Sequence, residues 1–257
     1  MGKWLTANLN YAKEEFQLLV GAWTQKPILQ AYEAVLDETK AVFIVADRSD
    51  LIQKRHRSGR FYEPGELRHM LKHFRGGTFL DVGTNVGNHA IFFAKQQTCS
   101  QVIAIEPNPD ALFLLKLNLQ ANHLRSKVEL HECALGAKSS KLQIHTPRGN
   151  LGGAHIVASG AVDADTEKSI PVVTGESLLD GRIVDFIKMD VEGFEIEALR
   201  GLDQTIRRCR PTLFIEVQNE NRSALNALVK DWDYHEPKCF SRYGDSENLL
   251  LVPKVIS

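Results

Sequence analysis

A short run of glycine and acidic residues, residues 81–88, has the composition of a nucleotide-binding loop. Asp81 precedes Gly83 and Gly87, and Glu106 follows Gly87 by 19 residues. Glycines let the backbone turn sharply and approach a ligand, because no Cβ atom stands in the way. An acidic residue at that spacing is placed to accept hydrogen bonds from ribose hydroxyl groups. Loop, spacing and carboxylate together predict a cofactor that contains a nucleoside.

The identity of this cofactor depends on how the loop begins. A dinucleotide-binding loop has three glycines and a helix N-terminus that receives the pyrophosphate. Here the middle position is Asn85, and the loop begins with Asp81. A carboxylate at that position repels a pyrophosphate but suits the ammonium group of a methionine moiety. The loop therefore favours S-adenosylmethionine over NAD; the alternative role for Asp81 is to cap the loop.

A second group of carboxylates lies in the second half of the chain. Asp190 ends a predicted strand, and Glu192 and Glu195 follow near the start of a predicted helix. Glu195 is expected to be structural, because a carboxylate near a helix N-terminus interacts favourably with the helix dipole. Three roles stay open for Asp190 and Glu192: holding the methionine end of the cofactor, orienting an acceptor hydroxyl group, or binding a hard cation.

A further carboxylate, Glu216, lies within an apolar run that predicts its burial. A buried carboxylate needs a partner or a metal. Together with Asp190, it would form a site of oxygen ligands for Mg²⁺ or Ca²⁺. The alternative is an ion pair between Glu216 and a nearby Arg or Lys.

Two histidines join the carboxylates as candidates for a catalytic base. His155 follows residues 149–154, a glycine-containing loop able to close over an acceptor, and His145 precedes that loop. In methyl transfer, alignment of donor and acceptor contributes ~7–11 kcal/mol. A general base accelerates the reaction typically ~10²–10⁴-fold, which corresponds to about 3–5 kcal/mol and is less than the contribution of alignment. We therefore predict Asp190, Glu192 and His155 as catalytic residues, without an obligatory triad.

The elements that carry these residues alternate between strands and helices. The predicted strands are residues 78–83, 101–106, 127–132, 141–145, 185–190 and 212–217, with two edge-like runs at 238–240 and 249–252. Asn108 is a good N-cap and Pro109 suits the first helical position, so a helix is predicted to about residue 121. This alternation predicts a mainly parallel sheet with helices on both faces. In such sheets, ligands bind beyond the carboxyl ends of the strands, where the acidic residues are placed.

Residues 1–57 form a separate region in this interpretation. Apolar positions such as Phe16, Leu19 and Trp23 predict a helical N-terminal extension, which a short strand at residues 41–45 interrupts. Residues 58–257 are predicted to form the cofactor-binding domain.

The amino-acid composition limits the binding partners and the cellular location that we expect for the protein. The chain has 31 Lys and Arg residues against 32 Asp and Glu residues, so it gives no strong nucleic-acid signal. Its four cysteines are scattered without a CxxC pair, which favours a reducing, cytoplasmic location. No apolar run approaches the ~20 residues needed to span a bilayer. We expect a cytoplasmic protein without a membrane span, and leave open whether it forms a homo-oligomer.

Several of these segments resemble the FkbM family of methyltransferases. The resemblance is carried by residues 81–87, 106–108, 132–136 and above all 188–195 with 199–201, and the segments 61–66 and 248–253 are similar too. The Asp-Val-Glu-Gly sequence at residues 190–193 is quite specific. The glycine loop, in contrast, is shared broadly among class I methyltransferases.

The resemblance implies S-adenosylmethionine as cofactor and a Rossmann-like class I fold, with a seven-stranded, mainly parallel sheet and helices on both faces. It covers roughly residues 60–253, so the N-terminal helical extension is expected in addition to this fold. It implies O-methylation of a hydroxyl group on a sugar, glycolipid or secondary metabolite, so the acceptor would be a small molecule or a glycan. Methylation of nitrogen or of a macromolecule stays an alternative, as does a nucleoside-binding or NAD-binding protein. Cofactor contacts are expected from Asp81, Gly83, Asn85, Gly87, Asn88, Glu106, Pro107, Asn108, Glu132, Cys133, Ala134 and Asp190.

Overall fold

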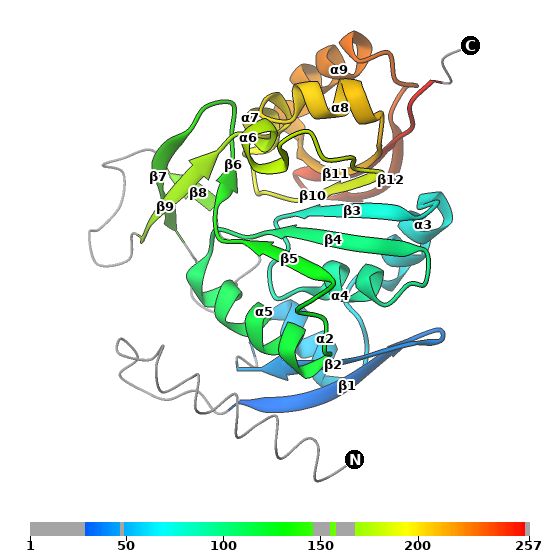
Figure 1. Cartoon of the computed structure of the whole chain (residues 1–257), viewed down its shortest axis with the longest axis vertical. Helices are drawn as coiled ribbons and strands as arrows, with labels where there is room; N and C mark the ends of the chain where they lie inside the picture. Colours follow the sequence, from blue (N-terminus) through cyan, green and yellow to red (C-terminus); the bar gives the residue numbers. More distant parts are fainter. Residues whose placement is uncertain (1–28, 47–48, 146–154, 158–167, 255–257) are drawn as a thin grey trace.

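The computed structural model describes residues 29–46, 49–145, 155–157 and 168–254. At its centre is a seven-stranded sheet with the strand order β12-β13-β11-β10-β3-β4-β5 (Figure 1). The strands are β3 (Gly77–Val82), β4 (Cys99–Ile105), β5 (Val128–His131), β10 (Phe186–Met189), β11 (Thr212–Gln218), β12 (Lys238–Tyr243) and β13 (Ser246–Leu251). The five strands from β11 to β5 are parallel, whereas β13 runs antiparallel to β11 and to β12. The predicted seven-stranded, mainly parallel sheet is confirmed, and of the two edge-like runs β12 lies at the edge while β13 lies inside the sheet.

Helices cover both faces of this sheet, as predicted. Figure 1 places α6 (Gly175–Leu179), α7 (Glu195–Arg200), α8 (Asp203–Cys209) and α9 (Arg222–Asp231) on one side and α3 (Pro64–His73), α4 (Asn88–Ala94) and α5 (Pro109–Ala121) on the other. A short 3-10 helix, η1 (Asn219–Asn221), precedes α9. None of the helices in the described part of the chain is both long and apolar enough to cross a membrane.

Alternating side chains along the central strands build a core on each face. In β3, Phe79 packs into the cluster beneath α3 and α4, while its neighbour Leu80 packs into the cluster on the opposite face. Phe186 and Ile187 of β10 divide in the same way. Successive side chains of a strand point to opposite faces, so a strand with helices on both sides is apolar throughout. Stacking of Phe79 on Phe93, with ring centroids 3.9 Å apart, joins the sheet to α4.

A second sheet of four short strands lies beside the central one (Figure 1). Its order is β6-β9-β7-β8, with β6 (Ala134–Leu135), β9 (Lys168–Val173), β7 (Ser140–His145) and β8 (His155–Val157). The strand predicted at residues 141–145 is therefore present, but it belongs to this second sheet.

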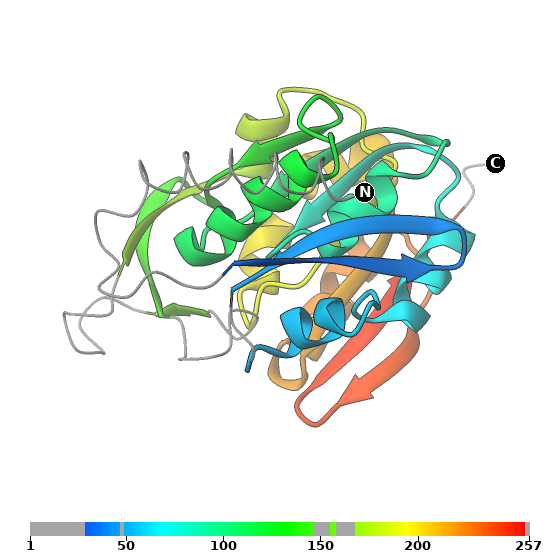
Figure 2. The same cartoon turned by 90° about the horizontal axis from the view of Figure 1, so that it is seen from below.

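The N-terminal part of the described chain is a β-hairpin followed by a helix, and Figure 2 shows the hairpin (blue) in front of the central elements. Its elements are β1 (Gln30–Leu36), β2 (Thr39–Val45) and α2 (Leu51–Arg57). The predicted strand at residues 41–45 is confirmed, but the helix expected before it is wrong for residues 30–36. In β1, Ala34 and Leu36 are buried while Glu33 and Val35 are exposed, and this period of two is that of a strand. The remainder of the expected helical region, residues 1–28, lies outside the described residues.

Candidate functional site

The site lies where the direction of strand order reverses in the central sheet. β3 has β4, the next central strand along the chain, on one side and β10, which follows much later, on the other. The loops that leave β3 and β10 therefore diverge at the carboxyl ends of these strands, which is where ligands bind in open α/β sheets. The two loops touch, because a Cβ atom added to Gly83 would overlap the carbonyl oxygen of Asp190. Glycine at this position, with φ of 76°, is thus required by both space and backbone conformation.

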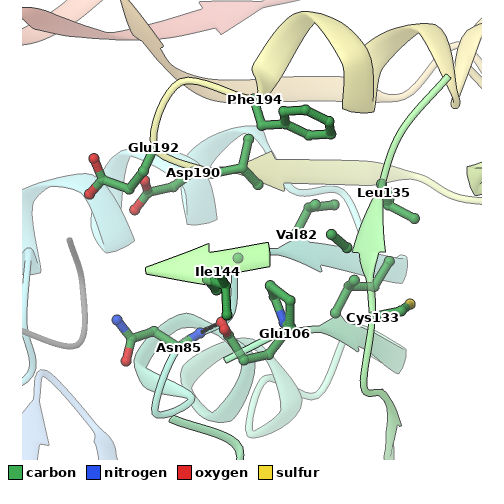
Figure 3. A pocket seen from close by; sticks show the side chains of 14 residues that line it. Val82, Asn85, Glu106, Cys133, Leu135, Ile144, Asp190, Glu192 and Phe194 are labelled. Atoms are coloured by element: carbon green, nitrogen blue, oxygen red, sulfur yellow. Dashed lines mark hydrogen bonds between the residues drawn. The ribbon is translucent and has the colours of Figure 1, made fainter. Parts of the chain in front are cut away.

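A pocket of about 600 Å³ of empty volume, partly open to solvent, opens at this point. Figure 3 shows the side chains of Asp190 and Glu192 side by side at one end, with Cys133, Leu135 and Phe194 at the other. The apolar wall is formed by Val82, Ile105, Pro107, Cys133, Leu135, Ile144 and Phe194, and the polar groups come from Asn85, Glu106, Asp190 and Glu192. An apolar cavity with a few convergent polar groups is typical of a small-molecule or cofactor site.

Glu106 holds the glycine loop and also lines the pocket. One carboxylate oxygen accepts a hydrogen bond of 2.7 Å from the backbone N–H of Asn85, and the other accepts one of 2.8 Å from Asn108. Burial raises the pKa of Glu106 to about 7, although these two backbone donors act in the opposite direction. Asn85 adopts a left-handed conformation, with φ of 51°, which directs its N–H toward Glu106. The carboxylate predicted to contact ribose is therefore also the group that orders the loop.

Asp81 lies beneath the loop, fully buried, and is not among the residues that line the pocket. Its carboxylate accepts a hydrogen bond from the Thr84 hydroxyl group and lies 3.5 Å from the ammonium group of Lys188. Burial raises the pKa of Asp81, and Lys188 opposes this shift. The contact between Asp81 and a methionine ammonium group stays a prediction.

Lys188 is a site residue that the sequence analysis did not assign. Its side chain is almost fully buried, and Nζ donates a hydrogen bond of 3.0 Å to the carbonyl oxygen of Gly83. Nζ also lies 3.7 Å from the Asp190 carboxylate. Burial alone would lower the pKa of Lys188, but the surrounding carboxylates, with Asp81 and Asp190 the strongest, raise it overall. A lysine within the apolar strand β10 was the available signal, because a buried charge requires partners.

Two acidic side chains, Glu192 and Glu63, lie near enough to Asp190 for its charge to act on them. Glu192 has φ of 47°, and burial together with the charge of Asp190 raises its pKa to about 8. Glu63, which precedes α3 with φ of 50°, has its pKa raised to about 8 by the same two causes in the same order. Its carboxylate lies 3.5 Å from Nε2 of the buried His89. Glu63 was absent from the predicted site, although it belongs to the segment 61–66 that carried part of the family resemblance.

The metal site expected at Asp190 and Glu216 finds no support. The Glu216 carboxylate accepts a hydrogen bond of 2.7 Å from the Ser246 hydroxyl group. Within the described ranges, no group of three or more His, Cys, Asp or Glu side chains is arranged to hold a metal ion.

Three of the other predicted cofactor residues, Pro107, Cys133 and Ala134, line the pocket, and three polar ones are not among its lining residues. The Asn88 side chain bonds to the backbone of Tyr62 and to His56. Asn108 caps α5 through the N–H of Asp110. Glu132 is exposed and pairs with Lys116 at 2.6 Å. Contacts of these three with a cofactor stay predictions.

The two remaining predicted site residues are Gly87, a predicted cofactor contact, and His155, a predicted catalytic residue. Gly87 precedes α4 with φ of 92°, and a Cβ atom there would press on Leu115. His155 lies in β8 opposite His145 of β7, but the His155 side chain is outside what the structure describes. Ile144, next to His145, lines the pocket, so the second sheet forms part of its wall.

Comparison with known proteins gives a consistent result. Residues 81–240, more than half of the chain, match the sequence profile of the methyltransferase FkbM domain. The chain is 25% identical over 185 residues to "Methyltransferase sdnD" from Sordaria araneosa, a match that covers 59% of this chain and 71% of that protein. It is 30% identical over 132 residues to "Hexuronic acid methyltransferase AglP" from Haloferax volcanii, covering 49% of this chain and 50% of the relative.

A solved structure with the same fold extends this comparison. The structure is methyltransferase FkbM from Methylobacillus flagellatus KT, which superposes with a TM-score of 0.51 at 21% sequence identity. The superposition covers 68% of this chain and 43% of that one. At this level of identity, the likeness shows the fold, and this chain corresponds to less than half of that protein.

Proposed function

Because the chain belongs to the FkbM family of methyltransferases, we propose that it transfers the methyl group of S-adenosylmethionine to a hydroxyl group of a sugar, glycolipid or secondary metabolite. The observation that carries this proposal is the pocket between the loops of β3 and β10. It combines an apolar wall, the Glu106 carboxylate and the carboxylates of Asp190 and Glu192 at one end. These three parts correspond to the base, the ribose and the reacting end of a nucleoside cofactor.

The residues present fit this cofactor. Gly83 leaves the space that a Cβ atom would occupy between the two loops. Asn85 Oδ1 is buried and has no hydrogen-bond partner in the described protein, so a donor of the cofactor would satisfy it. Ile105, Pro107 and Leu135 offer an apolar surface for an adenine ring. Glu106 would accept hydrogen bonds from ribose hydroxyl groups in addition to those that it receives from the backbone.

The protein's main contribution to the reaction is alignment. When bound, S-adenosylmethionine supplies a methyl group activated by the positive charge of its sulfonium. Holding an acceptor oxygen in line with that methyl group is worth ~7–11 kcal/mol. Asp190, at the rim of the pocket, would orient the acceptor hydroxyl group through a hydrogen bond.

Glu192 is suited to accept the hydroxyl proton. It lines the pocket beside Asp190. Burial, together with the carboxylates of Asp190, Glu216, Glu195 and Asp245, raises the pKa of Glu192 to about 8. General bases work best when their pKa lies near the working pH.

The acceptor class is proposed on the chemistry of the end of the pocket that Asp190 and Glu192 line. Their carboxylates are hydrogen-bond acceptors when ionised, and hydroxyl-rich molecules supply the matching donors. One matched relative is named for methylation of a hexuronic acid, which is a hydroxylated sugar derivative.

Calorimetric titration with S-adenosylmethionine and with NAD tests the cofactor. Micromolar binding of S-adenosylmethionine and no binding of NAD are expected, and tighter binding of NAD would refute the assignment. A panel of uronic acids, neutral sugars, hydroxylated metabolites and amines, followed by mass spectrometry of the products, then tests the acceptor. Methylation of amines alone would replace O-methylation by N-methylation.

A further inference from the structure

One buried side chain, Asn118 of α5, connects the N-terminal hairpin to the glycine loop. Its Nδ2 donates a hydrogen bond of 2.7 Å to the carbonyl oxygen of Val86, which lies in the loop. Its Oδ1 accepts a hydrogen bond of 2.6 Å from the backbone N–H of Ile44 in β2. Asn118 is fully buried, so water does not compete for either bond.

A small apolar cluster supports the same connection. Ile44 and Val86 are both buried in a cluster with Leu114, Leu117 and Ala121 of α5. The hairpin and the loop are therefore joined twice, once through the Asn118 amide and once through side-chain packing. Figure 1 shows β2 lying along α5, which is where this cluster forms.

A second asparagine, one helical turn further on, provides an internal comparison. Asn122 Oδ1 accepts a hydrogen bond of 3.0 Å from the N–H of Val42, and its Nδ2 donates one of 2.7 Å to the Val42 carbonyl oxygen. Residues four apart lie on the same face of a helix, so the two asparagines together bond three backbone groups on the outer edge of β2: both groups of Val42 and the N–H of Ile44. Both hold the hairpin, whereas Asn118 also holds the loop.

The hydrogen bond from Asn118 to the Val86 carbonyl oxygen matters because of the position of Val86 in the loop. Val86 follows Asn85, whose N–H donates to Glu106, and precedes Gly87, the N-cap residue of α4. A buried carbonyl group that loses its donor must find another or move toward water. Loss of the Asn118 amide would therefore release the loop between its two anchored ends.

We propose that Asn118 is a positioning residue for the cofactor site, through which the N-terminal hairpin fixes the conformation of residues 83–88. The identity of the cofactor rests on the function proposed above, but the effect of Asn118 on the loop does not. In this proposal, the hairpin packs against α5 and also stabilises the conformation of the loop that binds the cofactor.

The test compares Asn118→Ala with Asn122→Ala, in the full chain and without cofactor. Both variants lose hydrogen bonds to β2, and only the first also loses the bond to the loop. Hydrogen exchange followed by mass spectrometry is expected to show backbone amides 83–88 exchanging about tenfold faster in Asn118→Ala than in Asn122→Ala, as for loss of one buried hydrogen bond. A titration with S-adenosylmethionine is expected to show affinity about tenfold lower in Asn118→Ala, with little change in Asn122→Ala.

A second variant, Asn118→Leu, serves if the alanine variant does not fold. Leucine fills about the volume of the amide side chain but has neither a donor nor an acceptor, so backbone amides 83–88 are expected to exchange about tenfold faster than in Asn122→Ala. Equal loop exchange in wild type, Asn118→Leu and Asn122→Ala would overturn the proposal. If wild type fails to bind S-adenosylmethionine, the proposed function fails, and the exchange comparison still decides the role of Asn118.

Discussion

Lys188 and Asp81 are direct register partners on the neighbouring parallel strands β10 and β3, and their charged groups lie 3.5 Å apart. Both side chains are buried directly below the loop that forms the pocket. The ammonium group also donates to the Gly83 carbonyl oxygen, so the pair ties the two strands to the loop. An ion pair in this position requires both partners, because either charge alone would be stranded in the core.

Replacement of Lys188 by Met is expected to destabilise the fold by about 3–5 kcal/mol, the usual cost of breaking a buried ion pair. Lys116→Met, which removes the exposed pair with Glu132, is a matched control with an expected loss of ~0–1 kcal/mol. Urea denaturation measures both. Equal losses in the two variants would mean that the buried pair contributes no more than a surface contact.

The same variant has an expected pH dependence. Burial already raises the pKa of Asp81, and Lys188 opposes this shift, so its removal raises the pKa further. The folded state then binds more protons than the unfolded state, and stability must fall as the pH rises. Urea midpoints of Lys188→Met are expected to decrease from about pH 4 to pH 8 more steeply than those of wild type. Parallel pH profiles would show that Asp81 has another source of compensation.

Gly83 and Gly181 allow the contact between the two loops to be tested. Both have φ of 76°, so alanine is strained at either position. A Cβ atom at Gly83 would overlap the Asp190 carbonyl oxygen, whereas at Gly181 it would have no atom within 4 Å. Gly83→Ala is expected to abolish binding of S-adenosylmethionine in calorimetry, and Gly181→Ala is expected to retain it with stability about 1 kcal/mol lower. If Gly83→Ala binds S-adenosylmethionine with the affinity of wild type, the close contact between the two loops is not needed for cofactor binding.

The strands that build the site were predictable because burial on both faces makes them mostly apolar, with Asp81 and Lys188 as the charged exceptions. β3 and β10 occupy residues 77–82 and 186–189, close to the predicted ranges 78–83 and 185–190. The position of Glu106 at the end of the next strand followed from the same pattern. These features depend on short stretches of sequence, and each stretch carries its own signal.

The partners of these residues could not be predicted, because they depend on which strands and helices become neighbours. Lys188 and Asp81 are 107 positions apart in the sequence, and their contact follows from the pairing of β10 with β3. The strand at residues 30–36 was mistaken for a helix for a related reason. Its partner β2 is held by side-chain amides of Asn118 and Asn122, which a local pattern does not reveal.

Glu106→Gln is expected to weaken the cofactor site and flatten a pH effect on stability. The folded-state pKa of about 7 lies above the ordinary value of 4.5. Its contribution to stability is fully present below about pH 4.5 and is lost as the pH rises through 7. Glutamine carries no charge and keeps a single acceptor oxygen for the two backbone donors, so binding of S-adenosylmethionine is expected to fall about tenfold. Thermal unfolding between pH 4.5 and pH 8 measures the pH dependence of stability, and calorimetry measures cofactor binding. If Glu106→Gln has the same pH dependence of stability as wild type, the Glu106 carboxylate is solvated in the folded protein.

Comparison of Glu192 with Glu63 tests whether Glu192 is the catalytic base, because the two carboxyl groups have similar pKa values. Burial and the charge of Asp190 raise the pKa of each to about 8. Glu192 lines the pocket, whereas Glu63 is not among its lining residues and pairs with His89. A base must be deprotonated to accept the acceptor proton, so the turnover number of wild type is expected to rise with pH up to about 8.

Glu192→Gln is expected to lower the turnover number by ~10²–10⁴-fold and to remove this rise, while affinity for S-adenosylmethionine changes little. Glu63→Gln, the matched control, is expected to keep the rise, with its midpoint shifted at most slightly. Initial rates from pH 6 to pH 9 at saturating cofactor provide the measurement. If Glu63→Gln loses the rise and Glu192→Gln keeps it, the base is Glu63, and Glu192 serves to position the acceptor.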